Sequence, residues 1–282
     1  MRFLKGIYLS SILLYLLPGV VSPLFADVSE VKKPIFDTTR YLHKLKSNES
    51  FFIPMIILYE KKLLPSGPGI IDINHLRSLA LSLPKSSIPY ILDIESWKCG
   101  RKDDDIVASK SIDKYILVID TMKKTRPDLK FGYFGIIPTK PPIITNTHVQ
   151  VQINDWQHVL ERSRRLVSHV DVICPEGYTY FNDKTVWMRY MEAVINEAKT
   201  YGKPIYPFLW PEFMGSTPLN GKFIPRDFWK FQLNYVYTKC DGVIIWGGRN
   251  FAVVPAVSRE WDENAPWWID TKSYILKNRL YQ

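Results

Sequence analysis

Short apolar runs alternate with amphipathic stretches along most of this chain. Six runs have the length and composition of strands, and they cover residues 51–58, 89–95, 130–137, 171–175, 204–209 and 242–246. A shorter seventh run covers residues 70–73. Between the runs, apolar residues recur every three or four positions, which predicts helices. Strands that are apolar throughout and alternate with helices are typical of a parallel sheet with helices on both faces.

A closed, TIM-like (β/α) barrel of the α/β class accounts for these runs better than a doubly wound sheet does. No glycine-rich phosphate loop follows the first strand, as it usually does in a nucleotide-binding doubly wound sheet. A chain of 282 residues is long enough for one such barrel. We therefore predict a single barrel domain over residues 51–282, preceded by a lead-in segment over residues 27–50.

The first 26 residues have the pattern of a secretory signal peptide. Arg2 and Lys5 precede an apolar run over residues 6–25, and Ala26 offers a cleavage point. An uncleaved membrane anchor is the alternative. In both cases we expect the protein to be secreted, periplasmic or on the cell surface. No later stretch is long and apolar enough to predict a membrane span.

The formal net charge is +9, and it becomes +7 without residues 1–26, which carry two positive charges and no negative ones. A basic domain favours an anionic polysaccharide, an anionic surface or a nucleic acid as its partner. The lysines and arginines are scattered along the sequence, however, and no nucleic-acid-binding motif accompanies them. A nucleic acid is therefore not expected.

The cysteines and histidines do not predict a metal or a cofactor. Cys99, Cys174 and Cys240 allow at most one internal disulfide, and no pair of them has metal-ligand spacing. The five histidines lack such spacing as well. We expect no cofactor and no metal, and we expect Cys174 and Cys240 to be small buried residues.

The clearest chemical signal is the stretch Ile91-Leu92-Asp93-Ile94-Glu95-Ser96-Trp97. Side chains alternate between the two faces of a strand, so Asp93 and Glu95 are expected to point the same way. Two carboxyl groups on one face, beside an aromatic ring, are candidates for acid–base catalysis on a sugar. The alternative is a pair of surface acids, each held by a lysine or an arginine.

The ends of the other predicted strands are also rich in aromatic and acidic residues, and in a (β/α) barrel the active site lies at the carboxyl ends of the strands. In chain order these ends carry Tyr59-Glu60, Trp97 after the acid pair, Ile136–Pro138, then Glu176, Tyr178 and Tyr180, then Trp210 and Glu212, and finally Trp246 and Arg249. Aromatic rings stack on the apolar faces of sugars, and acids bind hydroxyl groups. Any one of these aromatics has the alternative role of filling the barrel mouth. Their concentration at strand ends favours a polysaccharide or oligosaccharide partner.

Two crowded carboxyl groups suit one form of glycoside cleavage in particular. They cannot both ionise easily, so one keeps a proton for the leaving oxygen while its partner stays charged. Neighbouring carboxyls on one strand lie on the same side of the bond, which disfavours an inverting pair with a water molecule between its members. The arrangement suits a substrate-assisted reaction instead, in which the N-acetyl group of an N-acetylhexosamine attacks the sugar.

The motif Asp93-Ile94-Glu95-Ser96-Trp97 resembles that of the hyaluronidase family of glycoside hydrolases. Two further stretches are similar to the family in kind: Gly132-Tyr133-Phe134-Gly135 followed by Pro138, and Gly242–Gly247 with its Trp246. The resemblance implies a distorted barrel of seven to eight strands. It also implies that Glu95 is the general acid, that Asp93 holds the acetamido group, and that Tyr133 and Trp246 line the sugar pocket.

The sequence departs from the family pattern after the Gly-Tyr strand. The family has a substrate-contacting tyrosine there, whereas this chain has Thr139-Lys140-Pro141-Pro142. Tyr178 or Tyr180, one strand later, is a candidate for the same role. The paired cysteines of the family are absent too, so a glycan other than hyaluronan is the expected substrate. The sequence thus predicts an exported glycoside hydrolase, and the alternative is a non-catalytic carbohydrate-binding or cell-surface protein on the same barrel.

Overall fold

A computed structural model describes residues 33–44, 52–100, 102–142, 149–215 and 218–279. The predicted signal peptide, residues 1–26, lies outside the described residues. The strands that matter for the site are β1 (Ile35–Asp37), β2 (Ile53–Pro54), β3 (Ile57–Tyr59), β4 (Tyr90–Asp93), β5 (Phe131–Tyr133), β6 (Phe208–Leu209) and β7 (Val243–Ile245).

These strands form a closed ring of parallel segments. One row runs β2-β1-β7-β6 and another runs β3-β4-β5, with every pair in both rows parallel. Residues 173–176 join the rows, because they bridge to Phe134 on one side and to Ile205 and Phe208 on the other. β2 and β3 belong to one continuous stretch, residues 53–59, and they join the rows at the opposite side. The described residues therefore contain seven strand segments in a TIM-type barrel, which confirms the predicted fold class.

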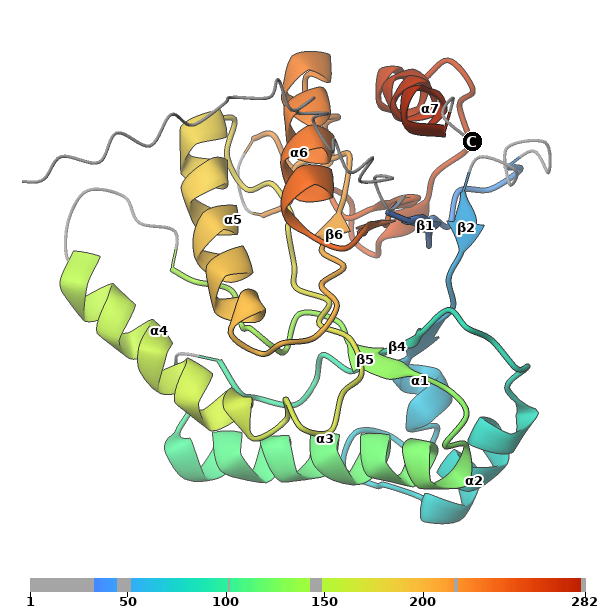
Figure 1. The fold of residues 1–282 in the computed structure, drawn as a ribbon, viewed down its shortest axis with the longest axis vertical. Coiled ribbons are helices and arrows are strands. Elements are labelled where there is room, and N and C mark those ends of the chain that lie inside the picture. Colours follow the sequence, from blue (N-terminus) through green and yellow to red (C-terminus); the bar gives the residue numbers. More distant parts are fainter. Residues whose placement is uncertain (1–32, 45–51, 101, 143–148, 216–217, 280–282) are drawn as a thin grey trace, which may run out of the picture. The chain divides into compact units, whose positions relative to one another are not determined.

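Helices follow the strands along the chain and surround them in Figure 1. They are α1 (Glu60–Leu63), α2 (Ile73–Ser82), α3 (Asp105–Thr125), α4 (Val149–Arg164), α5 (Lys184–Lys199), α6 (Arg226–Lys239) and α7 (Pro266–Arg279). Asp72, Asp104 and Asp183 each cap a helix by accepting two backbone N–H groups. A hairpin of β8 (Arg249–Asn250) and β9 (Val257–Ser258) lies between β7 and α7. Within the described part of the chain, no helix is long and apolar enough to cross a membrane.

Two local expectations need correction. The predicted short strand over residues 70–73 does not form: α2 begins at Ile73, and the side chain of Ile70 is 57% exposed. β1 instead lies within residues 27–50, the stretch expected to be a lead-in, and it pairs with β2 and β7. A strand of three residues is too short to show a hydrophobic period, so the pattern along the chain does not reveal it.

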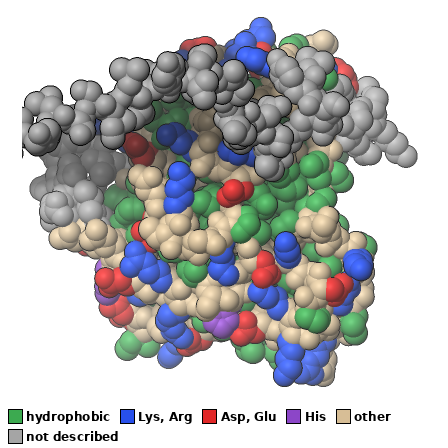
Figure 2. All heavy atoms as spheres, viewed as in Figure 1, with side chains coloured by type: hydrophobic (Ala, Val, Ile, Leu, Met, Phe, Trp, Pro, Cys, Tyr) green, Lys and Arg blue, Asp and Glu red, His purple; other side chains and the backbone are tan. Residues whose placement is uncertain are grey.

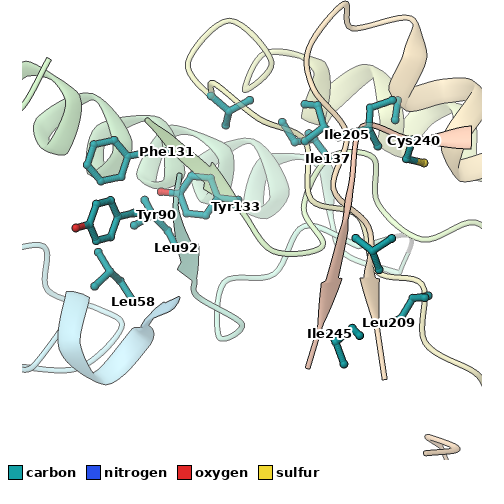
Figure 3. Close-up of a cluster of buried hydrophobic side chains, with 14 of the residues drawn as sticks. Leu58, Tyr90, Leu92, Phe131, Tyr133, Ile137, Ile205, Leu209, Cys240 and Ile245 are labelled. Carbon is teal, nitrogen blue, oxygen red and sulfur yellow. The ribbon is translucent and has the colours of Figure 1, made fainter. Parts of the chain in front are cut away.

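Side chains alternate between the inside of the ring and the surrounding helices. In β4, Tyr90 and Leu92 pack in the large hydrophobic cluster that contains the buried helix residues, whereas Ile91 packs in a second cluster. Every member of the second cluster comes from the strand segments or their ends, which places it inside the barrel. Figure 3 shows Tyr90, Leu92, Phe131 and Tyr133 together on the helix-facing side of β4 and β5. Successive residues of a strand point to opposite faces. A residue therefore packs either inside the barrel or against the helices according to its position along the strand.

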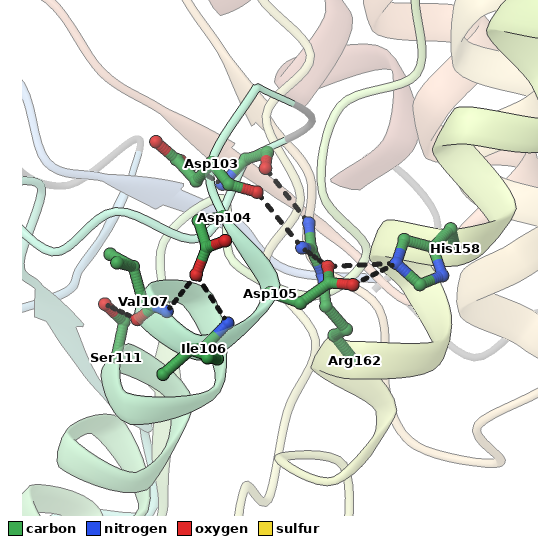
Figure 4. A network of polar contacts seen from close by, with 9 residues as sticks. Asp103, Asp104, Asp105, Ile106, Val107, Ser111, His158 and Arg162 are labelled. Atoms are coloured by element: carbon green, nitrogen blue, oxygen red, sulfur yellow. Dashed lines mark hydrogen bonds and ion pairs between the residues drawn. The ribbon is translucent and has the colours of Figure 1, made fainter.

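Buried thiols and a polar network complete this packing. Cys174 and Cys240 are free and buried, as expected. Arg162 of α4 donates to the carbonyl oxygen of Gly100 at 3.0 Å and pairs with Asp105, which also contacts His158 at 3.0 Å. This network, drawn in Figure 4, ties the loop that follows Trp97 to the start of α3 and to α4. It holds one side of the barrel mouth.

The face of the molecule seen in Figure 2 carries mixed charge. On the face seen in Figure 2, Lys and Arg side chains are interspersed with Asp and Glu side chains instead of forming a separate stripe. Charge of both signs is therefore spread over this face.

Candidate active site

A cavity of about 300 Å³ opens at the carboxyl ends of the barrel strands. Its walls are Arg40, Ile57, Tyr59, Asp93, Glu95, Phe134, Tyr178, Phe208, Trp210, Met214, Trp246, Arg249 and Phe251. Five of the ten residues predicted for the site are in this set: Asp93, Glu95, Tyr178, Trp210 and Trp246. The carboxyl pair and the aromatic residues of three other strand ends thus share one cavity.

Strand parity explains why these residues meet. In β4, Ile91 points into the barrel and Asp93, two residues later, continues on the same face. In β3, Ile57 and Tyr59 line the cavity, whereas Leu58 between them is fully buried in the helix-facing cluster. β3 and β4 pair with Tyr59 opposite Asp93. The pairing therefore sets a phenol beside the inner carboxyl group.

Asp93 is the deeper of the two acids. Its Oδ1 is buried and has no hydrogen-bond partner among the described residues. Burial, together with the negative charges of Glu95 and Glu60, raises the pKa of Asp93 to about 7. Asp93 therefore holds a proton into the neutral range. Its orphaned oxygen is available to accept an N–H or O–H group from a ligand.

Glu95 lies just beyond the end of β4 and is more open to solvent than Asp93. Burial raises the pKa of Glu95, as do the charges of Glu176 and Glu60, while Lys140 acts in the opposite direction. Within the described residues, the Glu95 side chain has no ion pair. It lines the cavity with Asp93, so the alternative of two separate, lysine-held surface acids does not describe this pair.

Aromatic rings form one wall of the cavity. Trp210 and Trp246 meet edge to face with their centroids 5.0 Å apart, and Tyr178 meets Trp210 in the same way at 5.3 Å. The Trp246 Nε1 group donates to the hydroxyl oxygen of Tyr59 at 3.2 Å. The Tyr178 hydroxyl has no hydrogen-bond partner in the described part of the chain, and burial raises the pKa of this phenol well above its usual value. Tyr178 thus offers a hydrogen-bond donor beside the acids.

Two cations also line the cavity. The guanidinium carbon of Arg40 lies 4.8 Å from the centre of the Tyr59 ring. Arg249 Nη2 donates to the carbonyl oxygen of Ala256 at 2.9 Å, across the β8–β9 hairpin. The cavity therefore combines acids, aromatics and two arginines. Among the described residues no group of three His, Cys, Asp or Glu side chains is arranged to hold a metal ion.

Three predicted residues are buried outside the cavity. Tyr133 faces the helices and donates to the carbonyl oxygen of Tyr115 at 2.8 Å, because β5 turns its neighbour Phe134 inward instead. Trp97 packs edge to face on Tyr115 and donates to the Pro68 carbonyl oxygen at 2.7 Å. Both side chains therefore pack in the core rather than line the sugar pocket that the sequence predicts for them.

The third, Glu212, is fully buried and lies 3.0 Å from Arg259 of the segment after β9. Burial raises the pKa of Glu212 to about 7, although Arg259 acts in the opposite direction. Glu212 thus fastens the segment that follows the β8–β9 hairpin, and it does not reach the cavity.

Glu176 and Tyr180 lie beside the cavity in a separate cluster. The Tyr180 hydroxyl donates to Glu176, and Lys140 Nζ donates to the same hydroxyl at 3.0 Å. Lys140 and Tyr180 line a second cavity of about 550 Å³, together with the loop residues around Asp103 and Thr139. This cluster still acts on the site, because the charges of Glu176 and Lys140 change the pKa of Glu95.

Several lining residues were not among the ten predicted site residues. Tyr59 and Arg249 were named among the strand-end residues but not chosen as site residues. Phe134 follows Tyr133 and points into the barrel, so the sequence pattern contained a signal for all three. Arg40 follows a strand that the pattern does not reveal, and Phe251 belongs to the β8–β9 hairpin. These two have no local signal.

Comparison with solved structures identifies the same fold elsewhere. The structure resembles bee venom hyaluronidase. One crystal structure of that enzyme matches with a TM-score of 0.53 and 15% identity, over 88% of this chain and 98% of the other. A second, in complex with a hyaluronic acid tetramer, matches with a TM-score of 0.52 and 16% identity, over 89% of this chain and 96% of the other. At this identity the likeness concerns the fold. No family model and no curated protein matches the sequence.

Proposed function

We propose that this protein is a glycoside hydrolase in which Glu95 is the acid and base and Asp93 is its partner. The observation that carries this proposal is the position of both carboxyl groups in one cavity with Tyr178, Trp210 and Trp246 as its wall. Acid catalysis of glycoside cleavage needs a protonated carboxyl group near neutral pH. The raised pKa values of Asp93 and Glu95 meet that need for the pair as a unit.

The two acids take different roles because they differ in depth. Glu95, which is open to solvent, gives its proton to the leaving glycosidic oxygen as the C1–O bond breaks. The carbonyl oxygen of the substrate's own N-acetyl group forms the new bond to C1, so an oxazolinium ion replaces the glycoside. The buried Oδ1 of Asp93 accepts the acetamido N–H and thereby orients the attacking group. Glu95 then takes a proton from water as the water oxygen bonds to C1. The C1–O bond of the oxazolinium ion breaks in this step, which restores the N-acetyl group, and the anomeric configuration is retained.

The substrate we propose is a glycan that contains N-acetylhexosamine. Arg40 and Arg249 in the cavity favour a glycan that also carries anionic groups. The similar bee venom enzyme holds a hyaluronic acid tetramer. The stretch Thr139–Pro142 differs from the hyaluronidase pattern, and Tyr178 supplies a phenol in the cavity from another strand, so we place the specificity on a different glycan. The apolar run over residues 6–25 supports a location outside the cytoplasm.

A binding protein without turnover is the second candidate. Two observations favour it: the open position of Glu95 and the absence of a tyrosine from residues 139–142. Such a protein would bind glycans in the same cavity, through the same aromatic wall. It would leave the glycosidic bond intact at every pH.

The test compares wild type with Glu95→Gln on a panel of N-acetylhexosamine-containing oligosaccharides, neutral and anionic. We expect wild type to release reducing ends and Glu95→Gln to lose at least about 10³-fold in kcat. Calorimetry should show that the variant still binds the glycan, and circular dichroism that it still folds. Asp155→Asn, an exposed carboxyl change on α4, is the matched control and should leave kcat unchanged. Binding by wild type without release of reducing ends would select the second candidate, and wild-type turnover by Glu95→Gln would remove Glu95 from the mechanism.

A further inference from the structure

Glu60 lies one residue after β3 and reaches across to the segment that carries Glu95. Its Oε2 accepts the backbone N–H groups of Glu95 and Ser96, each at 3.0 Å. β3 and β4 pair in parallel with Tyr59 opposite Asp93, so the residue after each strand end is brought close to its counterpart. One carboxylate oxygen thus receives two donors from a neighbouring strand end.

These two hydrogen bonds occur where the strand no longer supports the backbone. β4 ends at Asp93, so the N–H groups of Glu95 and Ser96 are beyond its ladder. The preceding residue is also held, because the carbonyl oxygen of Ile94 accepts the Tyr115 hydroxyl at 2.8 Å. With the main chain fixed on both sides, the Glu95 side chain keeps only its own torsions. Charged acceptors form stronger hydrogen bonds than neutral ones, so Glu60 is a firm anchor for this turn.

We propose that Glu60 is a positioning residue for the acid pair: its carboxylate fixes the backbone at Glu95 and Ser96 and thereby aims the Glu95 carboxyl group into the cavity. The inference rests on the proposed function for its catalytic meaning, but the contact itself can be measured without any substrate. Glu60 touches no reacting atom in this scheme. It acts through Glu95.

The charge of Glu60 has a second effect. It raises the pKa of both Asp93 and Glu95, and so helps the pair to keep a proton. The other charged groups that act on Glu95 are Glu176, which adds to the effect, and Lys140, which opposes it. Also facing the pair are the cations Arg40 and Arg249 and the phenols of Tyr59, Tyr178 and Tyr180. The charge of Glu60 thus acts on both Asp93 and Glu95, and its Oε2 also holds the backbone of Glu95.

Two substitutions separate the hydrogen bonds from the charge. Both N–H groups bind the same oxygen, and the amide oxygen of Gln has two lone pairs, so Glu60→Gln keeps both hydrogen bonds and removes the charge. Glu60→Ala removes the two hydrogen bonds and the charge together. Lys61→Ala, at the next position of α1 with an exposed side chain, is the matched control for disturbance of this short helix.

The substrate-free experiment is NMR on the four proteins. In Glu60→Ala the amide protons of Glu95 and Ser96 should exchange with solvent about tenfold faster than in wild type, and in Glu60→Gln they should stay protected. The side-chain carboxyls of Asp93 and Glu95 should titrate at lower pH in Glu60→Gln than in wild type. Lys61→Ala should show neither the faster exchange nor this acid shift. Unchanged exchange in Glu60→Ala, or an unchanged titration in Glu60→Gln, would overturn the inference.

Kinetics then measure the consequence. Glu60→Ala should lower kcat by about 10–100-fold with little change in KM, because the acid is misplaced while the sugar wall is intact. Glu60→Gln should keep most of its activity at acidic pH, and the fall in activity with rising pH should come at lower pH than in wild type. Wild-type kcat and pH profile in both variants would contradict the positioning role. If wild type itself cleaves no glycan, the proposed function fails while exchange and titration still decide the role of Glu60.

Discussion

Replacing Asp93 by Asn should make the protein more stable at alkaline pH. The side chains of Asp and Asn are nearly equal in volume, so the change mainly removes a titrating group from the cavity. Burial raises the pKa of Asp93 from 3.8 to about 7. In the unfolded chain the carboxyl group ionises near its ordinary value. The folded state therefore holds the Asp93 proton more tightly than the unfolded state does.

The size of the effect follows from the pKa difference. A difference of about 3 units corresponds to about 4 kcal/mol, at 1.36 kcal/mol per unit, and solvent in the open cavity reduces this to about 2–4 kcal/mol. A group whose folded pKa is raised contributes stability below its unfolded pKa, and that contribution is lost as the pH rises through about 7. Asn carries no charge at any pH. The free energy of unfolding of Asp93→Asn should therefore exceed that of wild type by about 2–4 kcal/mol at about pH 8.5, and by less at about pH 5.

Denaturant unfolding of both proteins at the two pH values measures this difference. The midpoint should move while the slope with denaturant stays the same. Asp155→Asn serves as the control, since Asp155 is exposed on α4, and it should match wild type at both pH values. If Asp93→Asn is no more stable than wild type at alkaline pH, the Asp93 carboxyl is not held in a charge-disfavouring cavity.

Three further predictions concern the aromatic wall of the cavity, its arginines and the packing of the barrel strands. Trp246→Ala should weaken glycan binding by about tenfold or more, since the side chain forms part of the aromatic wall. Calorimetry measures the dissociation constant of Glu95→Gln with and without this second substitution. Arg40→Gln should weaken binding of an anionic oligosaccharide more than of its neutral counterpart, with a difference that shrinks as salt is added; equal losses would exclude a charge role. Gly132→Ala should lower the free energy of unfolding by about 1–3 kcal/mol, because the new Cβ would lie 2.8 Å from the Val172 carbonyl oxygen. Gly69→Ala, with no atom within 4 Å, is its control, and a similar loss in both would refute this packing argument.

The barrel was predictable because its strands are fully apolar and regularly spaced. β4 shows this well: the apolar run before Asp93 predicted the strand, and the two-residue period predicted that Asp93 and Glu95 point the same way. The chain's first barrel strand was not predictable, because β1 is only three residues long and gains its place by pairing with β7, which lies about two hundred residues later. Such a pairing leaves no local pattern. Arg40 was missed for the same reason.

The site was predictable in part. Aromatic and acidic residues at strand ends included Asp93, Glu95 and Trp246, whereas the family resemblance added Tyr133, whose side chain in β5 points towards α3. Strict use of the two-residue period would have selected Phe134 instead. Glu212 shows another limit. Its burial beside Arg259 depends on a tertiary contact that no spacing along the chain predicts.

The most direct measurement is a crystal structure of Glu95→Gln with a bound N-acetylhexosamine oligosaccharide. The account predicts a sugar ring against Trp246, with its acetamido nitrogen about 3 Å from Asp93 Oδ1. The scissile oxygen should face residue 95. A sugar bound outside this cavity, or an acetamido group turned away from Asp93, would contradict the claim that these two acids act on a glycan.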